Sequence, residues 1–155
     1  MKKDIADLQI GNQISNEILF IVDYAKSLEQ AIADGKYGWE NSAHLNIKNF
    51  PISSEMIGKK IEVSAKIFSI DYDAKSDVVL TEMYEDNHQP ATLMELLAFG
   101  IAYPELQRQF LLIALGASNC GHVPYLGTNG GKRSLGCFWF SGIWAANYRF
   151  LGIRK

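Results

Sequence analysis

The chain has 155 residues, of which 48% are hydrophobic and 21% charged, and its formal net charge is −2. These values are typical of a single globular domain with one sizeable core. Two cysteines without a C-x-x-C pair argue against a disulfide framework or a zinc site. The amino end, MKKDIADLQIG, has no apolar run behind its lysines. We therefore expect neither a secretory signal nor a membrane span, and a location in the cytoplasm or, by another route, on a cell surface or virion.

The charges are distributed unevenly along the chain. All 17 acidic residues lie at or before Glu105, whereas six of the 15 basic residues follow it. A calcium site needs anionic oxygen ligands, and glycosidase or aspartic-protease chemistry needs paired carboxyl groups. The last third of the chain cannot supply either from its own side chains.

The first half of the chain predicts two strands and one helix. Residues 17–24, EILFIVDY, are rich in β-branched and aromatic residues and favour a strand, although so short an apolar run leaves a helix open. Residues 26–35 place Leu28, Ala31 and Ile32 at helical spacing, and Gly35 ends that pattern. A polar, irregular connection follows as far as Pro51. Residues 61–71 alternate apolar with polar side chains, which predicts a strand with one wet face.

Two further helices are predicted after residue 75. Residues 76–87 carry Val78, Val79 and Met83 on one side, with Ser76 as a candidate cap. Residues 92–100 begin with Thr92 and have Glu95 three positions later, which is the capping-box pattern, and we expect Gly100 to end this helix. A short helical turn is expected over residues 104–110.

Short strands are predicted over the remaining chain, at residues 111–116, 122–127, 134–140 and 148–155. A glycine-rich stretch at 127–134 and the sequence SGIWAAN at 141–147 separate the last three of them. The order of strand, helices and then clustered strands predicts an α+β fold: two helices plus a cluster of short, mostly antiparallel strands.

No local motif predicts catalysis or metal binding. His44, His88 and His122 are scattered, and only Cys120 lies near a histidine in the sequence. A tetrahedral metal needs three or four ligands, so we expect no metal and no cofactor. The sequence GTNGGK lacks the spacing of a phosphate loop, and a hairpin turn explains it more simply.

The carboxyl-terminal segment FWFSGIWAANYRFLGIRK has no charge from Phe138 to Tyr148. Basic residues interleaved with aromatic ones could bind single-stranded nucleic acid, but here the positive charges lie at the ends of the segment. A strand buried on both faces would explain SLGCFWF, but not the aperiodic SGIWAAN.

The segment contains a spaced pattern of aromatic residues followed by a terminal run: Trp139, Phe140, Trp144, then Arg149, Phe150, Leu151, Gly152, Ile153, Arg154 and Lys155. In this order they resemble the ends of variable proteins of diversity-generating retroelements. The upstream stretch QPATLMELLAFGIAYPELQRQFLLIALG is similar to what precedes that tail in such proteins. The resemblance covers roughly residues 59–155 and is weaker before them. It implies a C-type lectin-like fold, a hypervariable segment at about 134–149, no cofactor and no catalysis.

The same resemblance implies a division of the chain and of the tail. Residues 1–58 would form a strand-helix extension packed on a ligand-binding domain of residues 59–155. Trp139, Trp144, Phe150 and Leu151 would belong to the core. The family mutates AAY codons to NNY codons, which never encode Trp, Met, Gln, Lys or Glu. The positions between framework residues all carry permitted residues and are the predicted ligand contacts: Gly136, Phe138, Ser141, Gly142, Ile143, Ala145, Ala146, Asn147 and Tyr148.

The expected function is therefore the binding of an unknown protein or other macromolecular ligand through a diversified surface. One alternative is an enzyme of the formylglycine-generating type, which shares the fold and would need Cys120 and Cys137 as reactive thiols. The other is a single-stranded nucleic-acid-binding module. We also expect Lys132, Arg133 and Arg149 to border the neutral surface and to steer an acidic partner towards it.

Overall fold

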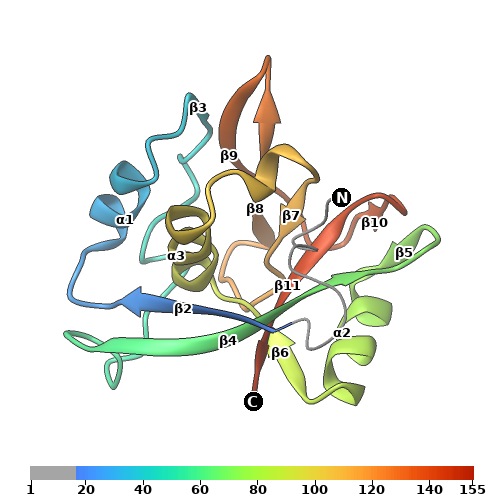
Figure 1. Ribbon diagram of the computed structural model, residues 1–155, viewed down its shortest axis with the longest axis horizontal. Coiled ribbons are helices and arrows are strands. Elements are labelled where there is room, and N and C mark those ends of the chain that lie inside the picture. Colours follow the sequence, from blue (N-terminus) through green and yellow to red (C-terminus); the bar gives the residue numbers. More distant parts are fainter. Residues whose placement is uncertain (1–16) are drawn as a thin grey trace.

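The computed structural model describes residues 17–155 as a mixed α+β fold (Figure 1). The longer strands are β2 (Ile18–Asp23), β4 (Lys60–Ser69), β8 (His122–Asn129), β9 (Lys132–Trp139) and β11 (Arg149–Arg154). The short strands are β3 (Trp39–Glu40), β5 (Ala74–Lys75), β6 (His88–Pro90), β7 (Leu112–Ile113) and β10 (Ile143–Trp144). The helices are α1 (Leu28–Asp34), α2 (Ser76–Glu85), α3 (Leu93–Ala102) and the 3-10 turn η1 (Leu106–Arg108).

One eight-stranded sheet organises the molecule. Its order is β2-β4-β11-β7-β8-β9-β3, and β6 also pairs with β11. Every pairing is antiparallel except β11 with β7 and β3 with β9. Strand β10 instead pairs with β5 in a separate two-stranded ribbon. The predicted mostly antiparallel α+β arrangement is confirmed, and the terminal strand β11 lies well inside the sheet.

The helices begin largely where the sequence predicts. The Ser27 hydroxyl accepts a hydrogen bond from Gln30 N and caps α1, which ends at Gly35. Thr92 and Glu95 form the predicted capping box at the start of α3. Helix α3 continues past Gly100 to Ala102, so the predicted end is wrong. A Cβ atom at Gly100 would lie 2.9 Å from Leu126 Cδ1, so a larger residue there would require the Leu126 side chain to shift.

Ser76 does not cap α2, which corrects the prediction. The helix starts at Ser76 itself, with Lys75 as its N-cap and without a side-chain cap hydrogen bond. The Ser76 hydroxyl instead donates to the carbonyl oxygen of Phe140, 2.7 Å away. The Ser76 hydroxyl is therefore hydrogen-bonded to the carboxyl-terminal segment and not to the backbone of the helix that it was predicted to cap.

Residues 17–58 share the sheet and the main core with the rest of the chain. Strand β2 pairs with β4 over six residues, and α1 packs against α3, as Figure 1 shows. The largest buried cluster joins Phe20 and Leu28 from the amino-terminal part to Leu97, Leu126 and Leu151 from the carboxyl-terminal part. This burial removes apolar side chains of both parts from water together.

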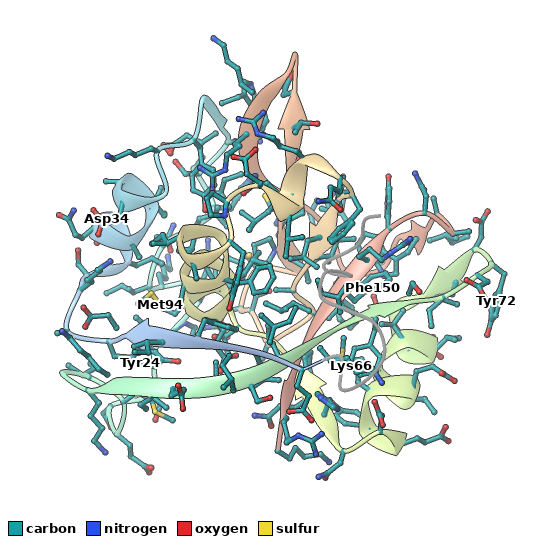
Figure 2. The ribbon with its side chains drawn as sticks, in the orientation of Figure 1. Tyr24, Asp34, Lys66, Tyr72, Met94 and Phe150 are labelled. Atoms are coloured by element: carbon teal, nitrogen blue, oxygen red, sulfur yellow. The ribbon has the colours of Figure 1, made fainter. Side chains whose placement is uncertain are left out.

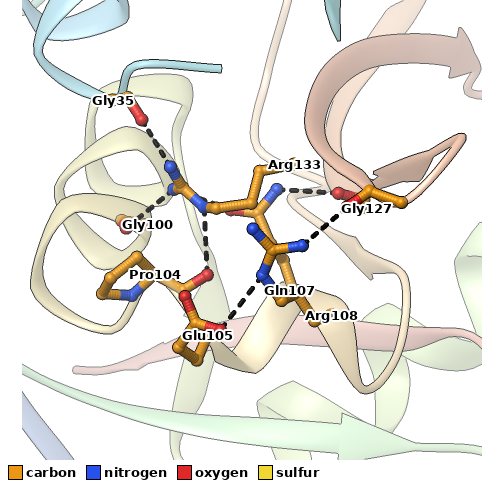
Figure 3. A network of polar contacts seen from close by, with 9 residues as sticks. Gly35, Gly100, Pro104, Glu105, Gln107, Arg108, Gly127 and Arg133 are labelled. Carbon is orange, nitrogen blue, oxygen red and sulfur yellow. Dashed lines mark hydrogen bonds and ion pairs between the residues drawn. The ribbon is translucent and has the colours of Figure 1, made fainter. Parts of the chain in front are cut away.

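A half-buried arginine links three elements behind the β8–β9 hairpin (Figure 3). The Arg133 guanidinium donates hydrogen bonds to the carbonyl oxygens of Gly35, Gly100 and Pro104, at 2.5, 3.1 and 3.0 Å. It also donates to Gln107 Oε1 at 3.0 Å, and its planar group lies over the Tyr37 ring at 4.9 Å. A single side chain thus connects the end of α1, the end of α3 and η1.

Within residues 17–155, no helix is both long enough and apolar enough to cross a lipid bilayer.

Candidate ligand-binding surface

Residues 138–148, here called the tail surface, run from the end of β9 through β10 to the start of β11. Two tight turns shape the segment, since Gly142 N donates to Trp139 O at 3.2 Å and Tyr148 N donates to Ala145 O at 3.0 Å. Strand β10 is held by β5, where Ile143 lies opposite Lys75 and Trp144 opposite Ala74. The segment is therefore fixed at both ends and in its middle.

Trp144 forms the floor of the tail surface. Its side chain is 3% exposed and packs against Phe150, with ring centroids 6.1 Å apart. Its indole Nε1 donates to the Ser76 hydroxyl at 2.9 Å, so the buried N–H has a partner. Phe150 and Leu151 are buried as well. The predicted core placement of Trp144, Phe150 and Leu151 is confirmed.

The nine predicted contact positions differ in exposure. Ser141, Ile143 and Asn147 are exposed, whereas Phe138, Gly142, Ala145, Ala146 and Tyr148 are half-buried. Gly136 departs from the expectation because it is buried beneath an aromatic ring. A Cβ atom there would lie 2.6 Å from Tyr125 Cζ. Only glycine leaves room for that ring, so Gly136 contributes to packing instead of to the tail surface.

Phe138 and Tyr148 belong partly to the support of the surface. The Phe138 ring stacks on Tyr125 at 4.4 Å and lies nearly parallel to Tyr148 at 6.0 Å. All three rings pack against the buried cluster that contains Trp144. Burial, together with nearby Cys137 and Tyr148, raises the pKa of the Tyr125 hydroxyl. Phe138 and Tyr148 are both half-buried, and each ring also packs on its neighbours.

Trp139 does not lie in the core, which corrects the prediction. Its side chain is 62% exposed and stacks on His122, whose ring in turn stacks on His44. Successive strand residues face opposite sides, so Trp139 shares the face of Leu135 and Cys137, which pack against the main core. Trp139 is the last residue of β9, and its exposure places it beyond that core. With Phe140 at 38% and Ile143 at 66%, it forms an exposed apolar group. Strand alternation could not have identified it, because the predicted exposed Phe138 and core Trp139 already alternate.

The predicted basic rim is present only in part, because Arg149 directly follows the tail surface whereas Arg133 lies away from it. Arg133 lies six residues from Trp139 along β9, about 20 Å at ~3.3 Å per residue, and its guanidinium is bonded to carbonyl groups. Arg149 Nη1 donates to the Asn147 and Tyr148 carbonyl oxygens at 3.1 and 3.3 Å. An acid also lies there, since Asp73 Oδ1 accepts from Ala146 N at 3.1 Å. The strand pairing of β5 with β10 brings this carboxylate to a segment that lacks one of its own.

The two cysteines are half-buried and pack against the main core. Burial, and secondarily Cys120, raises the pKa of the Cys137 thiol. A thiol is a nucleophile only as its thiolate, so this environment disfavours covalent chemistry at Cys137. Among residues 17–155, no group of three His, Cys, Asp or Glu side chains is placed to hold a metal ion.

No family model, no curated protein and no solved structure matches the chain.

Proposed function

We propose that the chain is a ligand-binding protein of the kind diversified by retroelements, with a C-type lectin-like fold and the tail surface as its binding face. One observation carries the proposal: exposed, aperiodic side chains at 141, 143 and 147 lie over a buried floor centred on Trp144. Side chains that do not support the core can change without unfolding the protein. A surface of this kind suits repeated diversification.

The chemistry of the tail surface suits a macromolecular ligand. Trp139, Phe140 and Ile143 offer apolar area, and Ser141 and Asn147 offer small polar groups beside it. Aromatic residues are enriched at the energetic centres of protein interfaces, and small polar residues adapt their hydrogen bonds to different partners. Tyr72, 59% exposed, precedes β5 and lies at the same end of the molecule (Figure 2). It extends the apolar area beyond the terminal segment.

Neither alternative gains support from a specific contact. An enzyme of the formylglycine-generating type would need a reactive thiol, whereas the pKa of Cys137 is raised. A nucleic-acid module would need free basic groups beside the aromatic rings. The guanidinium groups of Arg133 and Arg149 instead donate to carbonyl groups of the chain. The raised pKa of Cys137 and these hydrogen bonds support a non-catalytic, protein-directed surface, although the exposed Lys75 lies opposite Ile143.

The DNA around the gene tests the proposed origin of the surface. We expect a reverse-transcriptase gene and a near-copy of the sequence that encodes about residues 134–149. The copy should differ from the gene only where the copy has adenine, and the Trp139 and Trp144 codons should be identical in both. If tens of kilobases on either side contained neither feature, the retroelement proposal would be overturned.

A further inference from the structure

A hollow lies away from the tail surface, between the start of α3 and the loop that follows Phe50. This cavity of about 440 Å³, here called the Glu95 cavity, has mostly apolar walls that include Phe50, Ile52 and Met94. Its polar groups include Tyr24, Gln89 and Glu95. Figure 2 shows Met94 and Tyr24, which line it, near one another between α3 and the end of β2. Ligand sites are typically concave and apolar, with a few polar groups that fix orientation.

Among residues 17–155, Glu95 is the only charged side chain that lines the Glu95 cavity. It is 9% exposed, and its Oε1 accepts a hydrogen bond from Thr92 N at 2.8 Å. Within residues 17–155, no ion pair to a lysine or arginine offsets its charge. Burial raises the pKa of the carboxyl group, although both hydrogen bonds with Thr92 oppose that rise. A cation delivered by a ligand would compensate the desolvated charge.

The hydrogen-bonding groups of the cavity favour a donor over an anion. At the start of α3, the backbone N–H groups of Thr92 and Glu95 are taken by the capping box. The N–H groups of Leu93 and Met94 lie in the same turn as the Glu95 carboxylate, whose charge opposes the binding of an anion there. Gly116 N likewise donates to Ala91 O at 2.9 Å. Burial and the nearby Glu95 raise the pKa of Tyr24 to about 12, so its hydroxyl stays neutral. The remaining strong group is an acceptor, the Glu95 carboxylate.

The cavity also leads to a second hollow of about 370 Å³. The two share Tyr84, Pro90, Gly116 and Ala117 as lining residues, and the second reaches Gly121 and Phe140. Among the described residues, none that lines the second hollow is charged. The chain thus offers an acidic group in one hollow and an uncharged, largely apolar hollow next to it.

We propose that the Glu95 cavity binds a ligand with one alkylammonium group on an apolar body. The ammonium group donates to the Glu95 carboxylate, and the apolar body lies along Phe50 and Pro90 towards Ala117. A free aliphatic amine and a lysine side chain share this chemistry. This site goes beyond the proposed function and does not depend on it, because it uses none of the exposed side chains of the tail surface.

Calorimetric titration of the full chain tests the site with three probes of equal length. At neutral pH, n-hexylamine should bind, 1-hexanol should bind at least about tenfold more weakly, and hexanoate should not bind measurably. The peptide acetyl-Leu-Lys-Leu-amide separates the two sources. If the peptide binds more tightly than hexylamine, the natural ligand is a lysine side chain. If hexylamine binds more tightly, the natural ligand is a free amine.

Glu95→Gln is the decisive variant, because glutamine also completes a capping box while it removes the charge. We expect it to weaken hexylamine binding at least about tenfold and to leave 1-hexanol binding unchanged. Glu55→Gln removes the same charge from an exposed residue of the adjacent loop and should change neither. Ala117→Trp should weaken both probes by filling the shared part of the path.

Three results would overturn this site: no hexylamine binding at millimolar concentration, hexanoate binding as strong as that of hexylamine, or equal hexylamine binding by wild type and Glu95→Gln. Circular dichroism of each variant establishes that it is folded before titration. Because the DNA around the gene plays no part here, failure of this site and failure of the proposed function are separate outcomes.

Discussion

At the residue scale, Trp139 and Trp144 show how two identical side chains five positions apart take opposite roles. Trp144 is buried with its N–H bonded to Ser76, whereas Trp139 is 62% exposed and stacked on His122. The composition of the neighbouring sequence does not show which tryptophan is buried, because both lie in the same uncharged, aromatic segment. Their difference comes from where each falls in its strand and from which elements cover that strand.

Trp139→Ala should therefore change stability little, since it opens no internal cavity. We expect a loss within about 1 kcal/mol, which covers the stacking on His122. Urea unfolding followed by circular dichroism measures the change. A loss as large as about 3 kcal/mol would mean that Trp139 is buried in solution and would remove it from the binding surface.

Arg133 illustrates a second residue whose role depends on distant segments. Arg133→Lys replaces a planar group that reaches four acceptors with a point charge that has three donors. Because carbonyl groups are left unpaired, we expect a loss of about 2–4 kcal/mol in the free energy of unfolding.

Arg108→Lys is the matched control for this substitution. Arg108 is more exposed, pairs with Glu105 at 3.0 Å and donates to Gly131 O at 2.8 Å. Its replacement should cost at most about 1 kcal/mol. Similar losses in the two variants would show that the Arg133 contacts contribute no more than an ordinary surface arginine.

At the scale of elements, the start of α3 couples helix formation to pH through Glu95. Burial raises its pKa above the ordinary 4.5, so the folded state holds this proton more tightly than the unfolded state. That contribution to stability is present below pH 4.5 and is lost as the pH rises through the raised pKa. Asp34 and Asp86, whose pKa values are lowered by ion pairs and hydrogen bonds, act in the opposite direction.

Comparison of wild type with Glu95→Gln isolates the Glu95 contribution, because the other titrating groups are common to both. We expect the difference in free energy of unfolding to shift in favour of the glutamine variant between about pH 4 and about pH 7. Urea midpoints at several pH values measure it. A difference that stays constant, or that shifts in favour of wild type, would contradict a raised pKa.

Elements with a local pattern could be predicted from the sequence. The alternation in β4 and the capping box of α3 both identify the element in which they occur, and Asn129-Gly130-Gly131 identifies the β8–β9 turn. The strands β3, β5 and β10 have two residues each and are too short to show an alternation of apolar and polar side chains. Their pairing is fixed by contacts between distant segments, so they could not be predicted.

At the scale of the whole molecule, pairing between distant strands determines the candidate site. The β5–β10 ribbon brings Asp73 to the tail surface, and Ser76 of α2 receives the Trp144 N–H. Most of the tail positions could be proposed from the sequence, but not which of them are covered. Gly136 is covered by Tyr125, a side chain of the neighbouring strand, and its burial has no local signal. The Glu95 cavity likewise forms only when the loop after Phe50 meets α3.

We expect the tail surface to vary without loss of the fold beneath it. Urea unfolding of the triple variant Ser141→Ala, Ile143→Ser, Asn147→Ala, compared with Trp144→Ala, tests this expectation. We expect the triple variant to lose at most about 1.5 kcal/mol, as three independent surface changes would. Trp144→Ala should lose about 3–5 kcal/mol because it leaves a cavity. Equal losses in the two proteins would show that the segment is an ordinary part of the core and would contradict the account.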